Sequence, residues 1–205
     1  MIVIIDYGMG NLGSILNMCR FLNIEASIED DVESIKNAKK IILPGVGSFD
    51  TAMERIKKNG LQDVLNKKAL EEKIPFLGIC LGMQLLTNRS QEGSLPGLGW
   101  IDAEAIKFPE NRVLKVPHVG WNEAKPGKSD PMVKGLLEDS RFYFVHSYFV
   151  KTNNSEHSLM KTNYGITFDS AISKDNIYGF QFHPEKSHKY GMKILKNFSE
   201  ININE

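Results

Sequence analysis

Three short apolar runs in the first half of the chain constrain its fold most strongly. Residues 2–5, 41–43 and 76–79 consist mainly of branched or aromatic side chains, as is typical of strands buried on both faces. Two longer segments between them, residues 10–23 and 49–70, carry apolar residues at helical spacing. This alternation predicts an α/β fold with a mostly parallel sheet, whose active site lies beyond the carboxyl ends of the strands.

The second half of the chain has a different pattern. Shorter β-like runs alternate there with turn-rich segments, at residues 100–108, 142–150, 167–172 and 178–182. They predict a smaller antiparallel portion, followed by a closing amphipathic helix at residues 189–201. Because the 205 residues contain no repeat and no interdomain linker, we expect a single domain spanning residues 1–205.

Charge and cysteine content narrow the classes of ligand. Lys and Arg together number 25, as do Asp and Glu, so nothing favours binding to nucleic acid or to an anionic membrane. Neither Cys19 nor Cys80 has disulfide-type or metal-type spacing, so we expect no metal and no cofactor. Cys19 falls on the apolar face of a predicted helix and is expected in the core. No leader or membrane-spanning run is evident, which favours the cytoplasm.

Residues 75–88, PFLGICLGMQLLTN, contain the strongest candidate nucleophile. An apolar run is followed by Cys80 between Gly78 and Gly82, and then by a segment typical of a helix. A nucleophile elbow requires this order, because the reactive side chain sits on a strained turn that only small neighbours permit. A helix N-terminus also favours thiolate, the attacking species. The alternative is that Cys80 is a small buried hydrophobe.

A base for this nucleophile is available late in the chain, in GFQFHPEKS. His183 ends an apolar run, and Pro184 favours an extended conformation for it. In extended chain, positions two apart face the same side, so Glu185 can reach and orient the imidazole. The alternative is a half-buried histidine beside a solvated carboxylate.

A third feature is the loop Pro44-Gly45-Val46-Gly47, which follows an apolar strand. Its two glycines free the backbone to present N–H groups to a developing oxyanion. The alternative is a plain turn.

Together these segments resemble one enzyme family. PGVG, GICLGMQLL and GFQFHPEKS are similar to the class I, triad-type glutamine amidotransferases. PHVGWN, YFVHSY and the opening DYGMGNLGS are most similar to its HisH-type members, the glutaminase subunits of imidazole glycerol phosphate synthases. The resemblance extends from about Ile2 to Phe198 and implies an open, flavodoxin-like α/β sheet, mostly parallel, with flanking helices.

The resemblance also implies roles for individual residues. The catalytic triad would be Cys80, His183 and Glu185. The oxyanion hole would be formed by Gly45, Val46, Gly47 and Leu81. Glutamine would be bound by Gln84, His146, Ser147 and Tyr148, and a partner subunit by Trp121 and Asn122. For Trp121 the alternative is a core aromatic residue.

The function that the resemblance implies is hydrolysis of L-glutamine to glutamate and ammonia. The ammonia would pass to a synthase partner, a HisF-like TIM-barrel cyclase, in a heterodimer that makes imidazole glycerol phosphate and AICAR in histidine biosynthesis. PHVGWN has Val119 where methionine is common in the family, which leaves the acceptor open. Three alternatives remain: ammonia supply to a sugar amidotransferase for surface polysaccharide, a stand-alone cysteine γ-glutamyl hydrolase, and an inactive scaffold.

Overall fold

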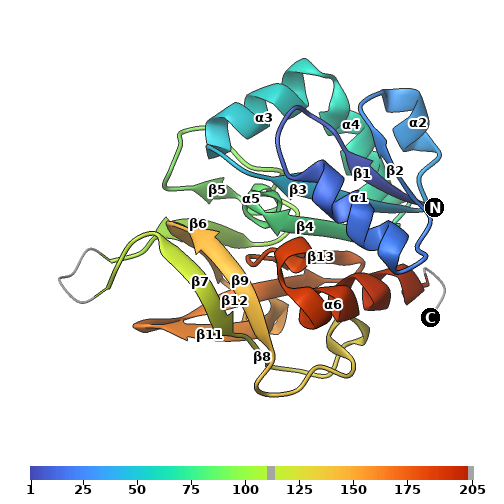
Figure 1. Cartoon of the computed structure of the whole chain (residues 1–205). Coiled ribbons are helices and arrows are strands. Elements are labelled where there is room, and N and C mark those ends of the chain that lie inside the picture. The colour runs from blue at the N-terminus through green and yellow to red at the C-terminus, as the bar shows by residue number, and fades with distance from the viewer. Residues whose placement is uncertain (110–113, 203–205) are drawn as a thin grey trace.

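The structure is a computed structural model that describes residues 1–109 and 114–202 (Figure 1). The helices are α1 (Leu12–Phe21), α2 (Val32–Lys36), α3 (Phe49–Lys58), α4 (Leu61–Asn66), α5 (Leu81–Leu85) and α6 (His188–Glu200). The strands of the first half are β1 (Ile2–Ile5), β2 (Ala26–Glu29), β3 (Lys40–Gly45), β4 (Phe76–Cys80) and β5 (Arg89–Ser90). Those of the second half are β6 (Ala103–Lys107), β7 (His118–Glu123), β8 (Lys125–Pro126), β9 (Arg141–His146), β10 (Tyr148–Thr152), β11 (Ser158–Tyr164), β12 (Ile166–Lys174) and β13 (Ile177–Phe180).

Most of the strands join in one large sheet, in the order β2-β1-β3-β4-β13-β12-β10-β6-β5. The pairs from β2 to β13 are parallel, whereas β12 pairs antiparallel with β13 and with β10. The predicted α/β fold with a mostly parallel sheet and a smaller antiparallel portion is therefore confirmed.

Helices cover both faces of the parallel half, as Figure 1 shows. Val3 and Ile5 of β1 belong to a buried cluster with side chains of α3 and α4, whereas Ile2 and Ile4 belong to a cluster with side chains of α1 and α6. Cys19 lies in the second cluster and is fully buried, so its predicted place in the core is confirmed. Both faces of β1 are buried, which explains its continuous apolar sequence.

The predicted single run at 142–150 is wrong, because the chain changes sheets at Ser147. β9 pairs with β7 in a separate two-stranded antiparallel sheet, whereas β10 pairs with β6 in the large one. The run contains no glycine or proline to mark the change. β11 was not predicted either, since its sequence SLMKTNY is too polar for an apolar run.

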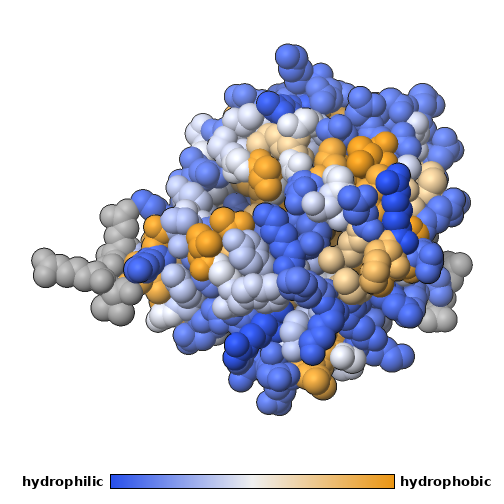
Figure 2. Space-filling view, in the orientation of Figure 1, coloured by the Kyte–Doolittle hydropathy of each residue, from blue (hydrophilic) through white to orange (hydrophobic). Residues whose placement is uncertain are grey.

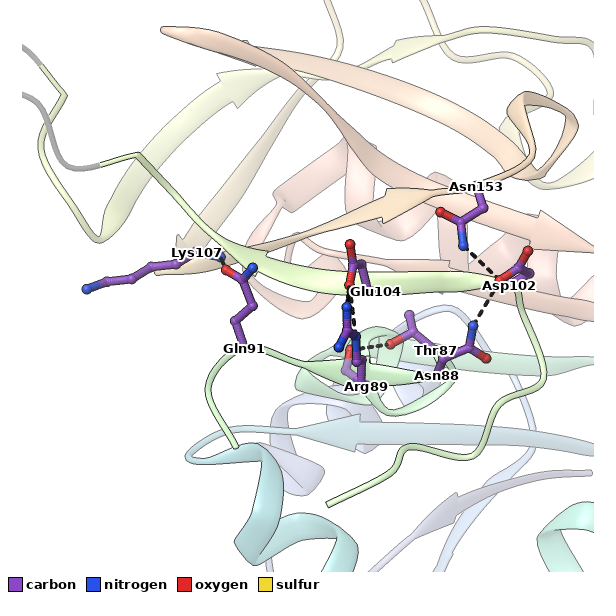
Figure 3. A network of polar contacts seen from close by, with 8 residues as sticks. All are labelled: Thr87, Asn88, Arg89, Gln91, Asp102, Glu104, Lys107 and Asn153. Atoms are coloured by element: carbon purple, nitrogen blue, oxygen red, sulfur yellow. Dashed lines mark hydrogen bonds and ion pairs between the residues drawn. The ribbon is translucent and has the colours of Figure 1, made fainter. Parts of the chain in front are cut away.

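A network of polar side chains connects the strands at the β6 and β5 edge of the large sheet (Figure 3). Asp102 Oδ1 accepts hydrogen bonds from Asn88 Nδ2 at 2.9 Å and from Asn153 Nδ2 at 2.8 Å. Arg89 of β5 pairs with Glu104 of β6 at 2.8 Å. The hydrogen bonds of Asp102 link the residues beside β5 and β6 to the loop that follows β10, and the ion pair links β5 to β6. Exposed ion pairs of this kind stabilise a fold only slightly.

Candidate functional site

Cys80 occupies a strained turn between the end of β4 and the start of α5. Its backbone angles are φ 55° and ψ −111°, in a region that side chains other than glycine rarely adopt. Such strain persists only where the surrounding structure imposes it, and it gathers at active sites. The strand, turn and helix that the sequence predicted for residues 75–88 are present.

The glycines on either side of Cys80 are required by close contacts. A Cβ on Gly82 would lie 1.8 Å from the carbonyl oxygen of Leu43 in β3. A Cβ on Gly78 would lie 2.6 Å from the carbonyl oxygen of Gly82. Both obstacles are backbone atoms, so the turn forms only when these two positions lack a side chain.

His183 and Glu185 lie in contact at the other end of the chain. His183 Nδ1 is 2.8 Å from Glu185 Oε1, and the two side chains are only 3% and 1% exposed. The predicted contact exists, and His183 itself is extended as predicted, with φ −98° and ψ 100°. The chain does not stay extended as far as Glu185, so the predicted reason for the contact is wrong. Residues Pro184–Lys186 form one turn of 3₁₀ helix, and this turn brings the carboxylate back to the ring. The alternative of a solvated carboxylate is excluded by its burial.

The imidazole of His183 is protonated at neutral pH in this environment. Burial alone lowers the pKa of His183, but the Cys80 sulfur and then the Glu185 carboxylate outweigh it and raise the pKa to about 10. The buried Nε2 of His183 lies on the Cys80 side of the ring and, within residues 1–109 and 114–202, has no hydrogen-bond partner besides that sulfur. That nitrogen can therefore exchange a proton with a ligand.

The loop after β3 reaches the same site. Gly45 is paired with Cys80 in the ladder between β3 and β4, and Gly47 has φ 103°. The phenol of Tyr7 donates a hydrogen bond to the carbonyl of Pro44 at 2.8 Å. Pro44 and Gly45 are the last two residues of β3, so this bond fixes the end of the strand and only Val46 and Gly47 of the predicted loop lie beyond it. Tyr7 was not singled out from the sequence.

A cavity of about 430 Å³ joins these features. Its walls are formed by Val46, Gly47, Cys80, Leu81, Gln84, Glu92, Pro117, Val145, His146, Ser147, Tyr148 and His183. The structure thus brings together most of the residues predicted for catalysis, the oxyanion hole and glutamine binding; Gly45 and Glu185 lie directly behind the walls. No cluster of three or more potential metal ligands occurs in the described ranges 1–109 and 114–202.

Glu92, Pro117 and Val145 line the cavity but were not predicted. Glu92 lies in the loop after β5, and its Oε2 accepts a hydrogen bond of 2.9 Å from the backbone N–H of Phe49 in α3. This long-range contact has no local sequence signal. Glu92 places a negative charge at the wall of the cavity, where a ligand cation can bind it.

Internal hydrogen bonds limit what Gln84 and His146 can offer a ligand. Nε2 of Gln84 donates to the Tyr148 carbonyl and to Gln181 Oε1, both at 3.2 Å. Only its Oε1 remains, so Gln84 can accept but not donate. His146 Nδ1 donates to the Tyr148 carbonyl at 2.7 Å, and its Nε2 lies 3.0 Å from His118 Nδ1. His146 therefore shapes the cavity without offering a free ring nitrogen.

His118 and His146 form a buried neutral pair. Burial lowers the pKa of His118 to about 4 and that of His146 to about 3. Because a carbonyl can only accept, His146 carries its proton on Nδ1 and accepts from His118 through Nε2. Asn122 Nδ2, 3.3 Å from His118 Nε2, completes the chain and leaves that nitrogen as an acceptor.

The small sheet of β7 and β9 presents an apolar outer face beside the cavity. Val119, Trp121, Tyr143 and Val145 make up this face, with Val119 paired to Val145 and Trp121 to Tyr143. Val119, Trp121 and Val145 are 54%, 47% and 38% exposed. Figure 2 shows hydrophobic side chains where β7 begins and β9 ends. The alternative of Trp121 as a core residue is therefore wrong. The side-chain nitrogen of Asn122, the other residue predicted to contact a partner, is already hydrogen-bonded within the chain, to His118 Nε2 and to the Asn163 carbonyl.

A strained cysteine facing a histidine and carboxylate pair, at the carboxyl edge of a parallel sheet, is the arrangement of a cysteine-dependent amide hydrolase. The family model "Glutamine amidotransferase class-I" matches residues 3–201. The fold agrees: a solved structure described as a glutamine amidotransferase covers 97% of this chain and 97% of its own, with 18% identity and a TM-score of 0.74. A glutamine amidotransferase from Thermotoga maritima covers 97% and 82%, with 16% identity and a TM-score of 0.66.

Similar proteins of known name place the chain in one branch of this family. Imidazole glycerol phosphate synthase subunit HisH 2 of Methanococcus maripaludis is 57% identical, covering 97% of this chain and 98% of that protein. Subunit HisH 2 of Pseudomonas aeruginosa is 49% identical, covering 98% and 100%, and subunit HisH of Bdellovibrio bacteriovorus is 47% identical, covering 98% and 100%. The chain belongs to the class-I glutamine amidotransferases and, within them, to the HisH family. No helix of residues 1–109 and 114–202 has the length and apolar character needed to cross a bilayer.

Proposed function

We propose that this chain is the glutaminase subunit of an imidazole glycerol phosphate synthase, with Cys80, His183 and Glu185 as its catalytic triad. One observation carries the proposal. The strained Cys80 lines the same 430 Å³ cavity as His183, whose pKa is raised to about 10 by Cys80 and Glu185. A histidine with this pKa holds a proton at neutral pH, so it can act as the acid beside the Cys80 nucleophile.

The reaction follows from these positions. The Cys80 sulfur attacks the side-chain amide carbon of glutamine. Backbone N–H groups of the loop at Val46 and Gly47 and of Leu81 stabilise the oxyanion that forms. His183 gives its Nε2 proton to the departing ammonia, while Glu185 holds the ring by Nδ1. The same nitrogen then takes a proton from water, which hydrolyses the glutamyl thioester to glutamate.

The cavity walls also suit the amino-acid end of glutamine. Its α-ammonium group is a cation with three donors. Glu92 offers a carboxylate, and Gln84 offers only an acceptor because its amide nitrogen is fully engaged. Ser147 and Tyr148 complete the same wall and are proposed to contact the α-carboxylate.

Ammonia made in this cavity must reach its acceptor before water protonates it. The outer face of Val119, Trp121, Tyr143 and Val145 borders the cavity, and apolar faces of this kind mark protein interfaces. We place on it the synthase partner, a TIM-barrel cyclase, with Trp121 as an anchor. Names of the relatives support the pairing, since HisH is called a subunit of the synthase.

The test is glutamine turnover by the purified chain, alone and with its synthase subunit. Replacing Cys80 by Ala should lower turnover by roughly a thousandfold to a millionfold. Product formation by the complex from added ammonia should persist, because the acceptor chemistry lies on the partner. Loss of both activities would assign Cys80 a structural role only.

The same assay separates the alternatives. Stimulation by a sugar amidotransferase instead of the synthase would place the chain in polysaccharide synthesis. Turnover of γ-glutamyl peptides without any partner would mark a stand-alone hydrolase. A chain whose Cys80 does not react with a glutamine-mimicking electrophile would be a scaffold.

A further inference from the structure

Gln181 directly follows β13, and its side chain is completely buried, at 0% exposure. Its Nε2 lies 3.8 Å from the sulfur of Cys80, within hydrogen-bond range for that atom. Its Oε1 lies 3.2 Å from Nε2 of Gln84, and the same Gln84 nitrogen lies 3.2 Å from the carbonyl oxygen of Tyr148. Two amides thus form a continuous row from the main chain of β10 to the nucleophile.

The carbonyl at one end fixes the direction of every bond in this row. A main-chain carbonyl can only accept, so the atom of Gln84 that faces Tyr148 must be the donor nitrogen. That nitrogen also faces Gln181, which must therefore present its oxygen. The remaining atom of the Gln181 amide is the nitrogen, and one of its two N–H groups points at the sulfur. Reversing Gln181 would oppose two donors, and reversing both amides would oppose two acceptors at Tyr148.

We propose that Gln181 is a further catalytic group, which holds Cys80 as a thiolate by donating an N–H to the sulfur. The inference rests on the proposed function, in which that thiolate is the nucleophile. An amide N–H favours a sulfur anion over a neutral thiol, because only the anion gains a charge-assisted hydrogen bond. The triad of Cys80, His183 and Glu185 by itself gives Gln181 no role.

Other groups around the Cys80 sulfur also affect whether it is a thiol or a thiolate. The carbonyl of Val145, 4.0 Å from the sulfur, can only accept and so favours the neutral thiol. Among the described residues, His183 and Tyr7 interact electrostatically with Cys80. Glu185 contacts the far side of the His183 ring, and Glu92 lines the same cavity. Burial raises the pKa of Tyr7 above its ordinary value, and the pKa of His183 is about 10. Both keep their protons below about pH 9, so a titration from pH 5 to 9 reports on the sulfur.

The experiment measures the alkylation rate of Cys80 by iodoacetamide against pH, read at Cys80 by peptide mass spectrometry. Gln181→Met replaces the amide with an apolar chain of similar length. Gln181→Glu keeps an acceptor for Gln84 and removes the donor, but it also adds a negative charge beside the sulfur, so Gln181→Met is the cleaner test of the hydrogen bond. Both should move the pH midpoint of alkylation upward by about one unit, which is roughly a tenfold slower reaction at any pH below both midpoints. Ser170→Ala, a buried change beside the Gln181 backbone, should leave the midpoint in place.

Midpoints of both Gln181 variants equal to that of the unchanged chain would overturn the inference. If both variants lose the native circular dichroism spectrum, Gln84→Met decides instead, since it frees the Gln181 amide to turn and must also raise the midpoint. Failure of the proposed function looks different: the unchanged chain would then turn over no glutamine and resist a glutamine-mimicking electrophile.

Discussion

Glu185 Oε1 lies 2.8 Å from His183 Nδ1, and both side chains are buried. The carboxylate sits on one side of the ring, and the cavity with the Cys80 sulfur lies on the other. This relationship fixes which ring nitrogen serves the ligand, because Nδ1 is held by Glu185 and Nε2 lies on the side of Cys80 and the cavity. A change at Glu185 should therefore act through the protonation of His183, without removing any group from the cavity wall.

Replacing Glu185 by Gln tests that relationship. The amide keeps the size of the side chain but removes the negative charge, so the pKa of His183 should fall from about 10. We expect kcat for glutamine to fall by roughly a thousandfold, with KM little changed. The pKa is measured by NMR titration of the imidazole, and kcat by glutamate release. An unchanged histidine titration alongside normal kcat would show that Glu185 does not orient the base.

Glu92 is expected to govern affinity and not the chemical step. Glu92→Gln retains an oxygen for the Phe49 N–H but removes the charge offered to the α-ammonium group. KM for glutamine should rise by roughly tenfold while kcat stays within about twofold. The matched control is Glu104→Gln, which removes an acidic side chain that pairs with Arg89 at the sheet edge. Equal KM values for both variants would remove Glu92 from the binding site.

Gly82 should tolerate no side chain. Gly82→Ala forces a Cβ to within 1.8 Å of the Leu43 carbonyl, so β3 and α5 must separate. The free energy of unfolding should fall by roughly 3 kcal/mol, and turnover should be lost with it. Gly13→Ala is the control, since a Cβ there meets nothing within 4 Å and α1 gains a better helix former. Urea denaturation of the two variants compares them; equal stabilities would contradict the close contact.

Local sequence patterns predicted the features that depend on a few adjacent residues. Short apolar runs located β1, β3 and β4, and the spacing of Gly78, Cys80 and Gly82 located the turn. These signals are readable because close backbone approach and buried strands each demand particular residue types at fixed positions.

Features that depend on the register between distant strands could not be predicted in this way. His118 and His146 meet because β7 and β9 pair antiparallel, and neither residue signals that register. Glu92 reaches the cavity through a loop whose course the sequence does not specify. The roles of the triad, the oxyanion loop and the glutamine-binding residues remain predictions until turnover is measured.

The buried histidine pair should make the fold sensitive to acid. The pKa of His118 is about 4 and that of His146 about 3, whereas an unfolded histidine titrates near pH 6.5. As pH falls below 6.5, these histidines bind protons in the unfolded chain but not in the folded chain. The folded state therefore loses the part of its free energy of unfolding that the neutral pair contributes at neutral pH. The free energy of unfolding should fall by roughly 1.4 kcal/mol per pH unit for each histidine between about pH 6 and 4.

His118→Gln tests that slope by urea denaturation at a series of pH values. The variant lacks one of the two titrating rings, so its stability should decline less steeply below pH 6 by roughly 1.4 kcal/mol per pH unit. Above pH 7 the two proteins should show the same slope, because both histidines are then neutral in either state. Parallel curves through the acid range would mean that His118 is not held neutral in the fold.

Trp121 is expected to anchor the synthase subunit. It is 47% exposed on the face that also carries Val119 and Val145, and large aromatic side chains in such patches dominate binding energy. Trp121→Ala should weaken association by roughly 30-fold, about 2 kcal/mol, measured by calorimetric titration with the synthase subunit. Phe21→Ala is the control, since Phe21 is a more exposed aromatic residue, at 71%, on α1. Partner-stimulated glutamine turnover should then require more synthase subunit with Trp121→Ala but not with Phe21→Ala. Identical binding curves for the two variants would place the partner on another face of the molecule.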